Sequence, residues 1–237
     1  MLKDQRLVVP VKGEIKLLAI SDTHFPFVNN RNLNEVYKIA KDLQPTHIWQ
    51  CGDLYDAYSF SRFARSLNIM TPEMELKEGR AQAKSMWEKL QKASPKAECY
   101  QSRGNHSHRL VKSIMDKAPE FESLLDGPIS QLTEFKNVVD MKSARSEIEL
   151  GNMLLVHGWQ SRPGAHASYF GQSVVRGHSH HGGVTYISRK GLPIFELDCG
   201  HLADINALPL QYGETKTTSW VSGCGVVDKY GPRFIAL

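Results

Sequence analysis

Five short apolar segments of this chain each end in a small group of polar residues, most of them of the kinds that bind metal ions. The apolar segments are residues 14–20, 46–51, 97–102, 153–156 and 173–175. The polar groups that follow them are Ser21-Asp22-Thr23-His24, Gly52-Asp53, Gly104-Asn105-His106, His157 and Gly177-His178-Ser179-His180. Short apolar runs bounded by turn residues are typical of buried strands. Because ligands bind at strand ends in open α/β sheets, the pattern predicts that these groups lie at a ligand-binding edge.

The spacing of apolar residues predicts helices between the early strands and closely spaced strands later in the chain. Residues 32–43 repeat their apolar side chains as one face of a helix does. From about residue 137 onward, strand-like segments follow one another at 137–141, 146–150, 153–157, 173–176, 183–188, 193–198, 218–227 and 233–236. We therefore expect an α/β protein with two mixed β-sheets packed as a sandwich and flanked by helices.

A length of 237 residues, with 41% hydrophobic and 23% charged residues, suits one domain with a sizeable core. We predict a single domain over residues 1–237, with a helical insertion at about 55–96 that borders the active site. Thr71-Pro72 is a suitable helix start within this insertion. The following apolar stripe predicts packing on a sheet, with a mobile cap over the site as the alternative. The stripe consists of Ala83, Met86, Trp87 and Leu90.

The composition predicts where the protein is found and which kinds of partner it can bind. No apolar run approaches the roughly 18–20 residues of a membrane span. Charges and Pro10 interrupt the first twenty residues, where a signal peptide would be continuously apolar, so we predict a cytoplasmic protein without a membrane partner. The formal charge of +4 permits an anionic partner such as phosphate or nucleic acid without requiring one. The four cysteines are far apart in or after apolar segments, which predicts buried free thiols: Cys51, Cys99, Cys199 and Cys224.

The polar groups supply carboxylate, amide and imidazole donors and no thiolate. Such ligands suit Mn²⁺, Fe or Zn²⁺ rather than a structural thiolate zinc site. Asp22 and His24 can point at one ion because the chain turns at a strand end. His178 and His180 can do so because alternate residues of an extended segment share a side.

The motifs D-x-H, G-D, G-N-H, H and G-H-x-H, in this order, resemble the calcineurin-like metallophosphoesterase superfamily. All five occur in order between residues 22 and 180, about two thirds of the chain. Each motif alone is weak, whereas five in order, each after a predicted strand, are a strong signal. The resemblance implies the αββα metallophosphoesterase fold and hydrolysis of a phosphoester by a metal-activated hydroxide at two divalent ions. Manganese is the favoured ion, with iron, zinc, nickel and cobalt as alternatives.

The resemblance also implies a role for each motif residue. The implied ligands of the first metal are Asp22, His24 and His180, and those of the second are Asn105, His157, His178 and Asp53, which bridges the two ions. His106 is then a catalytic residue that faces the scissile phosphate and is not a ligand.

The residue after the Gly-Asn-His motif departs from the family pattern. An Asp or Glu often holds that histidine, whereas this chain has Ser107, so His106 depends on a carboxylate from elsewhere or works without one. Arg103, His108 and Arg109 flank the loop and are candidates to contact the substrate phosphate. The alternatives are structural salt bridges for the two arginines and a surface position at a helix start for His108.

The substrate class depends on weaker features. The protein-phosphatase branch carries Asp-Arg-Gly after the G-D motif, and here Asp56 is present without the Arg and Gly. The G-H-S-H motif resembles the branch rich in phosphodiesterases and DNA-end nucleases. We expect a nuclease-like phosphodiesterase acting on DNA, RNA or a nucleotide. The alternatives are a phosphomonoesterase acting on a small molecule or a phosphoprotein and, more remotely, a non-catalytic scaffold. The oligomeric state stays open.

Aromatic residues after Asp53 add a second interpretation of the insertion. Tyr55, Tyr58 and Phe60 precede Arg62 and Arg65, a mixture that can stack a nucleobase. The favoured alternative is that these rings pack a helix start.

Overall fold

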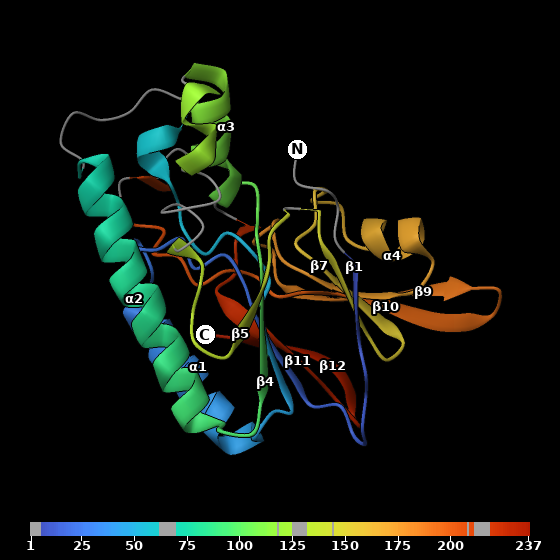
Figure 1. Ribbon diagram of the computed structural model, residues 1–237. Coiled ribbons are helices and arrows are strands. Elements are labelled where there is room, and N and C mark those ends of the chain that lie inside the picture. The colour runs from blue at the N-terminus through green and yellow to red at the C-terminus, as the bar shows by residue number, and fades with distance from the viewer. Residues whose placement is uncertain are drawn as a thin grey trace.

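The computed structural model describes residues 6–61, 70–117, 119–124, 132–143, 145–207, 209–210 and 219–237. Within these ranges the strands form two six-stranded sheets with helices outside them (Figure 1). The predicted fold class, two mixed sheets packed as a sandwich and flanked by helices, is confirmed.

The first sheet has the strand order β12-β11-β2-β3-β4-β5. Its strands are β2 (Leu17–Ile20), β3 (His47–Gln50), β4 (Glu98–Ser102), β5 (Val138–Met141), β11 (Gly223–Asp228) and β12 (Gly231–Ala236). Strands β2 to β5 run parallel, and β11 joins β2 antiparallel. The carboxyl ends of β2, β3 and β4 therefore meet at one edge.

The second sheet has the order β1-β6-β7-β8-β10-β9. Its strands are β1 (Arg6–Val9), β6 (Glu147–Leu150), β7 (Met153–Val156), β8 (Ser173–Arg176), β9 (Gly183–Arg189) and β10 (Leu192–Asp198). Strands β7 and β8 run parallel, so their carboxyl ends also lie together. The N-terminal strand β1 thus belongs to the second sheet, while the C-terminal hairpin β11–β12 belongs to the first.

Alternation along the strands creates an apolar layer on each side of the first sheet. In β2, Leu17 and Ala19 join the core between the sheets, whereas Leu18 and Ile20 join the core beneath the helices. Successive side chains of a strand point to opposite faces, so both faces of such a strand must be apolar to be covered. All four residues of β2 are buried, as this arrangement requires.

Two long helices cover the outer face of the first sheet. Figure 1 shows α1 (Asn30–Leu43) and α2 (Pro72–Ala93) side by side there. The short helix α4 (Ala165–Phe170) packs on the second sheet, against β8 and β10. The remaining helical elements are α3 (Ser107–Lys117) and the 3-10 helices η1 (Tyr58–Phe60) and η2 (Pro119–Leu124).

Helix α2 begins where the sequence predicts. The Thr71 hydroxyl accepts a hydrogen bond from the Met74 N–H, and Pro72 occupies the first turn. The apolar stripe of Ala83, Met86, Trp87 and Leu90 is buried in the core beneath the helices. The packing interpretation of this stripe is confirmed. The single-domain boundary and the role of residues 55–96 beside the site stay predictions.

All four cysteines are buried and free, as predicted. None of the helices in the described part of the chain is long and apolar enough to cross a membrane.

Candidate metal centre

The five polar motifs meet at the carboxyl ends of strands from both sheets. Asp22, Asp53 and His106 follow β2, β3 and β4 of the first sheet. His157 and His178 follow β7 and β8 of the second. The loops also bind one another, since the Asp22 N–H donates to the Gly52 carbonyl at 3.2 Å and the His24 N–H to the Asp53 carbonyl at 3.0 Å. The site therefore bridges the two layers of the sandwich.

Asp22, His24 and His180 form a buried group with converging donor atoms. The Nε2 atoms of His24 and His180 lie 3.8 and 3.2 Å from Asp22 Oδ1 and 3.4 Å from each other. Asp22 Oδ1 is buried and has no hydrogen-bond partner. Desolvating a carboxylate oxygen without a partner is costly. A cation bound between these three atoms would offset that cost, so the group fits a metal ion.

A second set of donors continues from the first. His157 Nε2 lies 3.4 Å from Asp53 Oδ2 and 3.1 Å from Asn105 Oδ1, and His178 Nδ1 lies 2.9 Å from the same Asn105 oxygen. Asp22, Asp53 and His157 also form a buried group of converging atoms, so Asp22 belongs to both groups. All seven residues predicted as ligands are thus brought together.

The backbone is strained at five of these seven residues. Asp22, His24, Asp53, His178 and His180 all have positive φ, between 47° and 74°. Residues other than glycine adopt this region infrequently, and such strain persists only where the surrounding structure imposes it. The strain is concentrated where the donor atoms converge, which is typical of a functional site.

Two glycines let neighbouring backbone approach the carboxylates. A Cβ atom at Gly104 would overlap the Asp53 carboxylate, and one at Gly177 would overlap the Ser21 hydroxyl and crowd the Asp22 carboxylate. Larger residues at either position would displace a donor group.

Two histidines of the second set titrate far from their ordinary pKa of 6.5. Burial alone would lower the pKa of His157, but the Asp53 and Asp22 carboxylates outweigh it and raise the pKa to about 9. Burial, together with the charge on His157, lowers the pKa of His178 to about 4. The Asp53 and Asp22 carboxylates therefore stabilise positive charge at His157.

His106 is held by a carboxylate that the sequence analysis did not assign. Asp56 Oδ1 lies 2.9 Å from His106 Nδ1 and 2.8 Å from His24 Nδ1. The Arg109 guanidinium lies 2.8 Å from His106 Nε2. Burial lowers the pKa of His106, against the opposing charges of Asp53 and Asp56. A neutral ring that donates from Nδ1 to Asp56 and accepts from Arg109 at Nε2 satisfies all three groups.

Asp56 therefore supplies the carboxylate that Ser107 does not. It orients His24 as well, which leaves the Nε2 atom of His24 free to face Asp22 and His180. Second-layer carboxylates commonly fix the ring of a metal-binding histidine in this way. The signal in the sequence is the acidic residue three positions after Asp53.

The other substrate-contact candidates lie in different settings. Arg103 forms a structural ion pair with Asp140 at 3.2 Å. Arg109 is mostly buried and binds the Asp56 carbonyl as well as His106. His108 is exposed at the start of α3. Of these three, the structure brings only Arg109 into contact with the cluster.

Tyr55 and Tyr58 are buried, and the Tyr55 hydroxyl donates to the Leu132 carbonyl at 2.5 Å. The packing interpretation of these two rings is confirmed, and their use as a base-stacking surface is wrong. Arg62 and Arg65 lie outside the described residues.

His201 is a further neighbour of the cluster. Its ring centre lies 5.3 Å from that of His180, and its Nδ1 atom is buried without a hydrogen-bond partner.

A buried ionic network supports the second-sheet half of the centre. Glu196 accepts from the Arg176 Nε–H at 2.7 Å, and Arg176 also contacts Asp198 at 2.9 Å and donates to the Gly177 carbonyl at 3.0 Å. The Glu196 carboxylate further accepts three backbone N–H groups around the start of α4, those of Gly164, His166 and Ala167. The network therefore ties α4 and the Gly177–His180 loop to β10.

Glu196→Gln is expected to lower the free energy of unfolding by about 3 kcal/mol, because it leaves a buried Arg176 with one carboxylate partner instead of two. Denaturant unfolding followed by circular dichroism measures the change. Glu35→Gln removes an exposed carboxylate paired with Lys38 and is the matched control, with an expected change within about 0.5 kcal/mol. Equal stability of Glu196→Gln and the parent chain would contradict a stabilising role for the network.

The two-sheet fold and the convergence of all five motifs are what the resemblance to calcineurin-like metallophosphoesterases implies, and that interpretation of the sequence is confirmed at the level of the fold. No family model matches the chain. A curated relative, the Gene 54 protein of Mycobacterium phage D29, is 25% identical over 237 residues, covering 91% of this chain and 89% of that protein.

Some solved structures with a similar fold carry phosphoesterase or phosphatase names, and others are structures of Vps29. YfcE, a phosphoesterase from E. coli, matches 91% of this chain and 89% of its own at 14% identity and a TM-score of 0.42. A dimetal phosphatase from Danio rerio matches 94% of this chain and 98% of its own at 10% identity and a TM-score of 0.45.

Proposed function

We propose that this protein is a metal-dependent phosphoester hydrolase of the calcineurin-like superfamily, with a phosphodiester of nucleic acid or a nucleotide as its substrate. One observation carries the proposal most strongly. Two carboxylates and three imidazoles converge at the ends of strands from two sheets, a fourth imidazole contacts Asn105 beside them, and one buried carboxylate oxygen has no hydrogen-bond partner. A ligand set of this kind suits a pair of divalent cations.

The proposed ligands divide between two ions. Asp22, His24 and His180 hold the first, and Asn105, His157 and His178 hold the second. Asp53 would be shared by the two ions, as the family resemblance implies, and its Oδ2 atom lies 3.4 Å from His157 Nε2. Two divalent ions against two carboxylates leave a net charge of about +2, which attracts a phosphate ester. Ions bound there supply Lewis-acid stabilisation of the phosphoryl oxygens and lower the pKa of a coordinated water. Manganese is the favoured ion.

The chain's own catalytic residue in this proposal is His106. Asp56 fixes the ring through Nδ1, and Nε2 lies beside the Arg109 guanidinium. To stabilise or protonate the leaving oxygen, the ring would have to be protonated, and Arg109 would turn from Nε2 to a phosphate oxygen. Arg109, adjacent to that nitrogen, places a second donor where a phosphate oxygen would lie.

A diester is favoured over a monoester by the motifs rather than by the geometry. The chain lacks the Asp-Arg-Gly sequence of the protein phosphatases and carries G-H-S-H. A phosphomonoesterase is the alternative. A non-catalytic scaffold predicts lost ligands, whereas all seven proposed ligands and His106 are present.

The test compares two chromogenic substrates with one leaving group, methyl 4-nitrophenyl phosphate and 4-nitrophenyl phosphate. Protein stripped of metal and reloaded with manganese is expected to hydrolyse the diester with the higher kcat/KM. A preference for the monoester would overturn the diesterase proposal in favour of the alternative. No hydrolysis of either, together with less than one bound metal per chain, would overturn the enzymatic function itself.

A further inference from the structure

A cavity of about 700 Å³ opens directly beside the second half of the metal centre. Asn105, His157 and His178 form one side of it. The volume is typical of pockets that hold small organic ligands. Whatever occupies this cavity therefore lies next to the proposed reacting phosphate.

Aromatic residues form another wall of the cavity. Trp159 is 48% exposed and Tyr169 is 71% exposed, and both line the cavity with Phe170. The three rings pack edge to face, with centroids 5.0 to 5.7 Å apart. The backbone N–H of Trp159 donates to His166 Nε2 at 3.0 Å, and the centroids of the Trp159 and His166 rings lie 4.5 Å apart. The wall is held in place yet keeps open ring surface, which is unusual for side chains this large.

Two arginines lie at the same cavity, on the side of β1 and β6. Arg6 is bound by Glu149 at 2.6 Å and approaches Glu147 at 3.7 Å. Arg145 is exposed, and among the residues that the structure describes its guanidinium forms no ion pair. An unpaired guanidinium near a phosphoryl site is suited to a further phosphate group.

We propose, resting on the phosphoesterase function above, that this cavity binds the nucleobase next to the scissile phosphate by stacking on Trp159 and Tyr169, and that Arg145 contacts the next phosphate of the strand. A nucleobase is planar and can stack on the aromatic wall, and the backbone that carries it is anionic. The same cavity offers the metal centre and the Arg145 guanidinium for the phosphates of that backbone. The same chemistry is present in a free nucleotide and in a single strand, and the second phosphate distinguishes them. The base-stacking surface thus lies after His157 rather than after Asp53.

The kinetic test compares thymidine 5′- and 3′-(4-nitrophenyl phosphate) with methyl 4-nitrophenyl phosphate, which has the same leaving group and no base. Trp159→Ala is expected to lower kcat/KM for at least one thymidine ester by about 5- to 150-fold, the range for stacking on an aromatic side chain, and to change the methyl ester less than about 2-fold. Tyr186→Ala removes an exposed ring on β9, outside this cavity, and is the matched control. Equal losses on all three esters, or no loss on any, would overturn the stacking proposal.

A binding test separates this proposal from the catalytic one. Anisotropy of a labelled hexathymidylate and of an abasic hexamer of equal charge is measured in manganese-free buffer. Trp159→Ala is expected to weaken hexathymidylate binding at least about 5-fold without affecting the abasic strand. If the parent chain hydrolyses none of the three esters but binds hexathymidylate more tightly than the abasic hexamer, the catalytic function is overturned and the proposed base site is supported. Equal binding of the two strands would overturn the base site.

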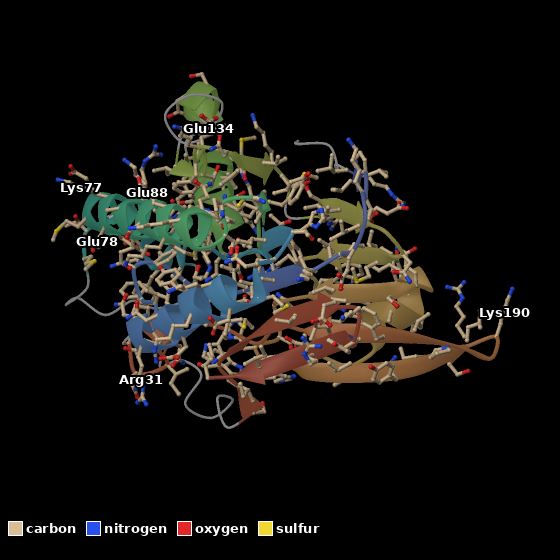
Figure 2. The ribbon with its side chains drawn as sticks, turned by 90° about the horizontal axis from the view of Figure 1, so that it is seen from below. Arg31, Lys77, Glu78, Glu88, Glu134 and Lys190 are labelled. Atoms are coloured by element: carbon tan, nitrogen blue, oxygen red, sulfur yellow. The ribbon has the colours of Figure 1, made fainter. Side chains whose placement is uncertain are left out.

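The second phosphate has its own readout. Arg145→Gln is expected to weaken both hexamers and to reduce the slope of log K against log salt by about 0.7, the value for one phosphate contact on a single strand. Lys190→Gln is the matched control, because Figure 2 shows Lys190 at the tip of the β9–β10 hairpin, away from the rest of the molecule. Hexathymidylate binding no tighter than thymidine 5′-monophosphate would overturn the Arg145 contact and assign the site to a free nucleotide.

Discussion

Asp53→Asn is expected to reduce phosphoester hydrolysis about 10³-fold or more and to lower the metal content. Its carboxylate is buried, accepts the His106 N–H at 2.7 Å and lies 3.4 Å from His157 Nε2. An amide of the same shape removes the negative charge that holds two cations close together, which costs several kcal/mol of stabilisation. Metal content by mass spectrometry of the purified protein and kcat/KM for the diester are the two measurements.

The matched control for this substitution is Asp228→Asn. Asp228 is also mostly buried and paired with an arginine, Arg233 at 2.6 Å, but lies at the end of β11 outside the cluster. It is expected to retain two metals and full activity. Retention of both metals by Asp53→Asn with unchanged activity would show that Asp53 is not a ligand.

His106→Asn is expected to lower kcat about 10²- to 10⁴-fold while leaving the metal content unchanged. His106 is not among the proposed ligands, since its two ring nitrogens face Asp56 and Arg109. Its removal therefore takes away a proton donor or transition-state contact without removing a bond to metal. Single-turnover rates together with metal analysis separate these two effects.

His47→Asn is the control for a buried histidine. His47 lies at the start of β3, at the opposite end of that strand from Asp53, and its Nδ1 pairs with the Thr46 hydroxyl at 2.8 Å. The kcat of His47→Asn is expected to stay within about 2-fold of that of the parent chain, because His47 lies outside the site. Loss of metal from His106→Asn would show that His106 binds an ion, and the division of roles proposed here would be wrong.

The strands of both sheets could be predicted because most of them are short apolar runs with a polar group or a turn at the end. The runs at 97–102 and 173–175 correspond to β4 and β8 within one residue at either end. β1 was not predicted, because this four-residue segment is a strand through its pairing with β6, which lies far later in the sequence. No range was predicted for helix α3, although the alternative for His108 placed a helix start there, and only Leu110 of its eleven residues is buried.

The donor set of the centre could be predicted because each donor sits at a fixed place after a strand. Asp56 could not be assigned a role from sequence, because its function depends on two rings from different loops reaching one oxygen. The position of the exposed aromatic wall could not be predicted either. Trp159 follows β7 and Tyr169 lies in α4, and only the packing of α4 on the second sheet brings them together.

The division of the centre between two sheets has a consequence for when activity can arise during synthesis. Asp22, Asp53 and Asn105 are made in the first half of the chain, whereas His157, His178 and His180 are made in the second. The first sheet is itself completed only by β11 and β12 at the C-terminus. A nascent chain that has reached Leu150 therefore carries less than a full ligand set on an unfinished sheet. If the proposed function holds, hydrolysis would therefore begin only after His180, β11 and β12 have been made, because the ligands and the first sheet are incomplete before then.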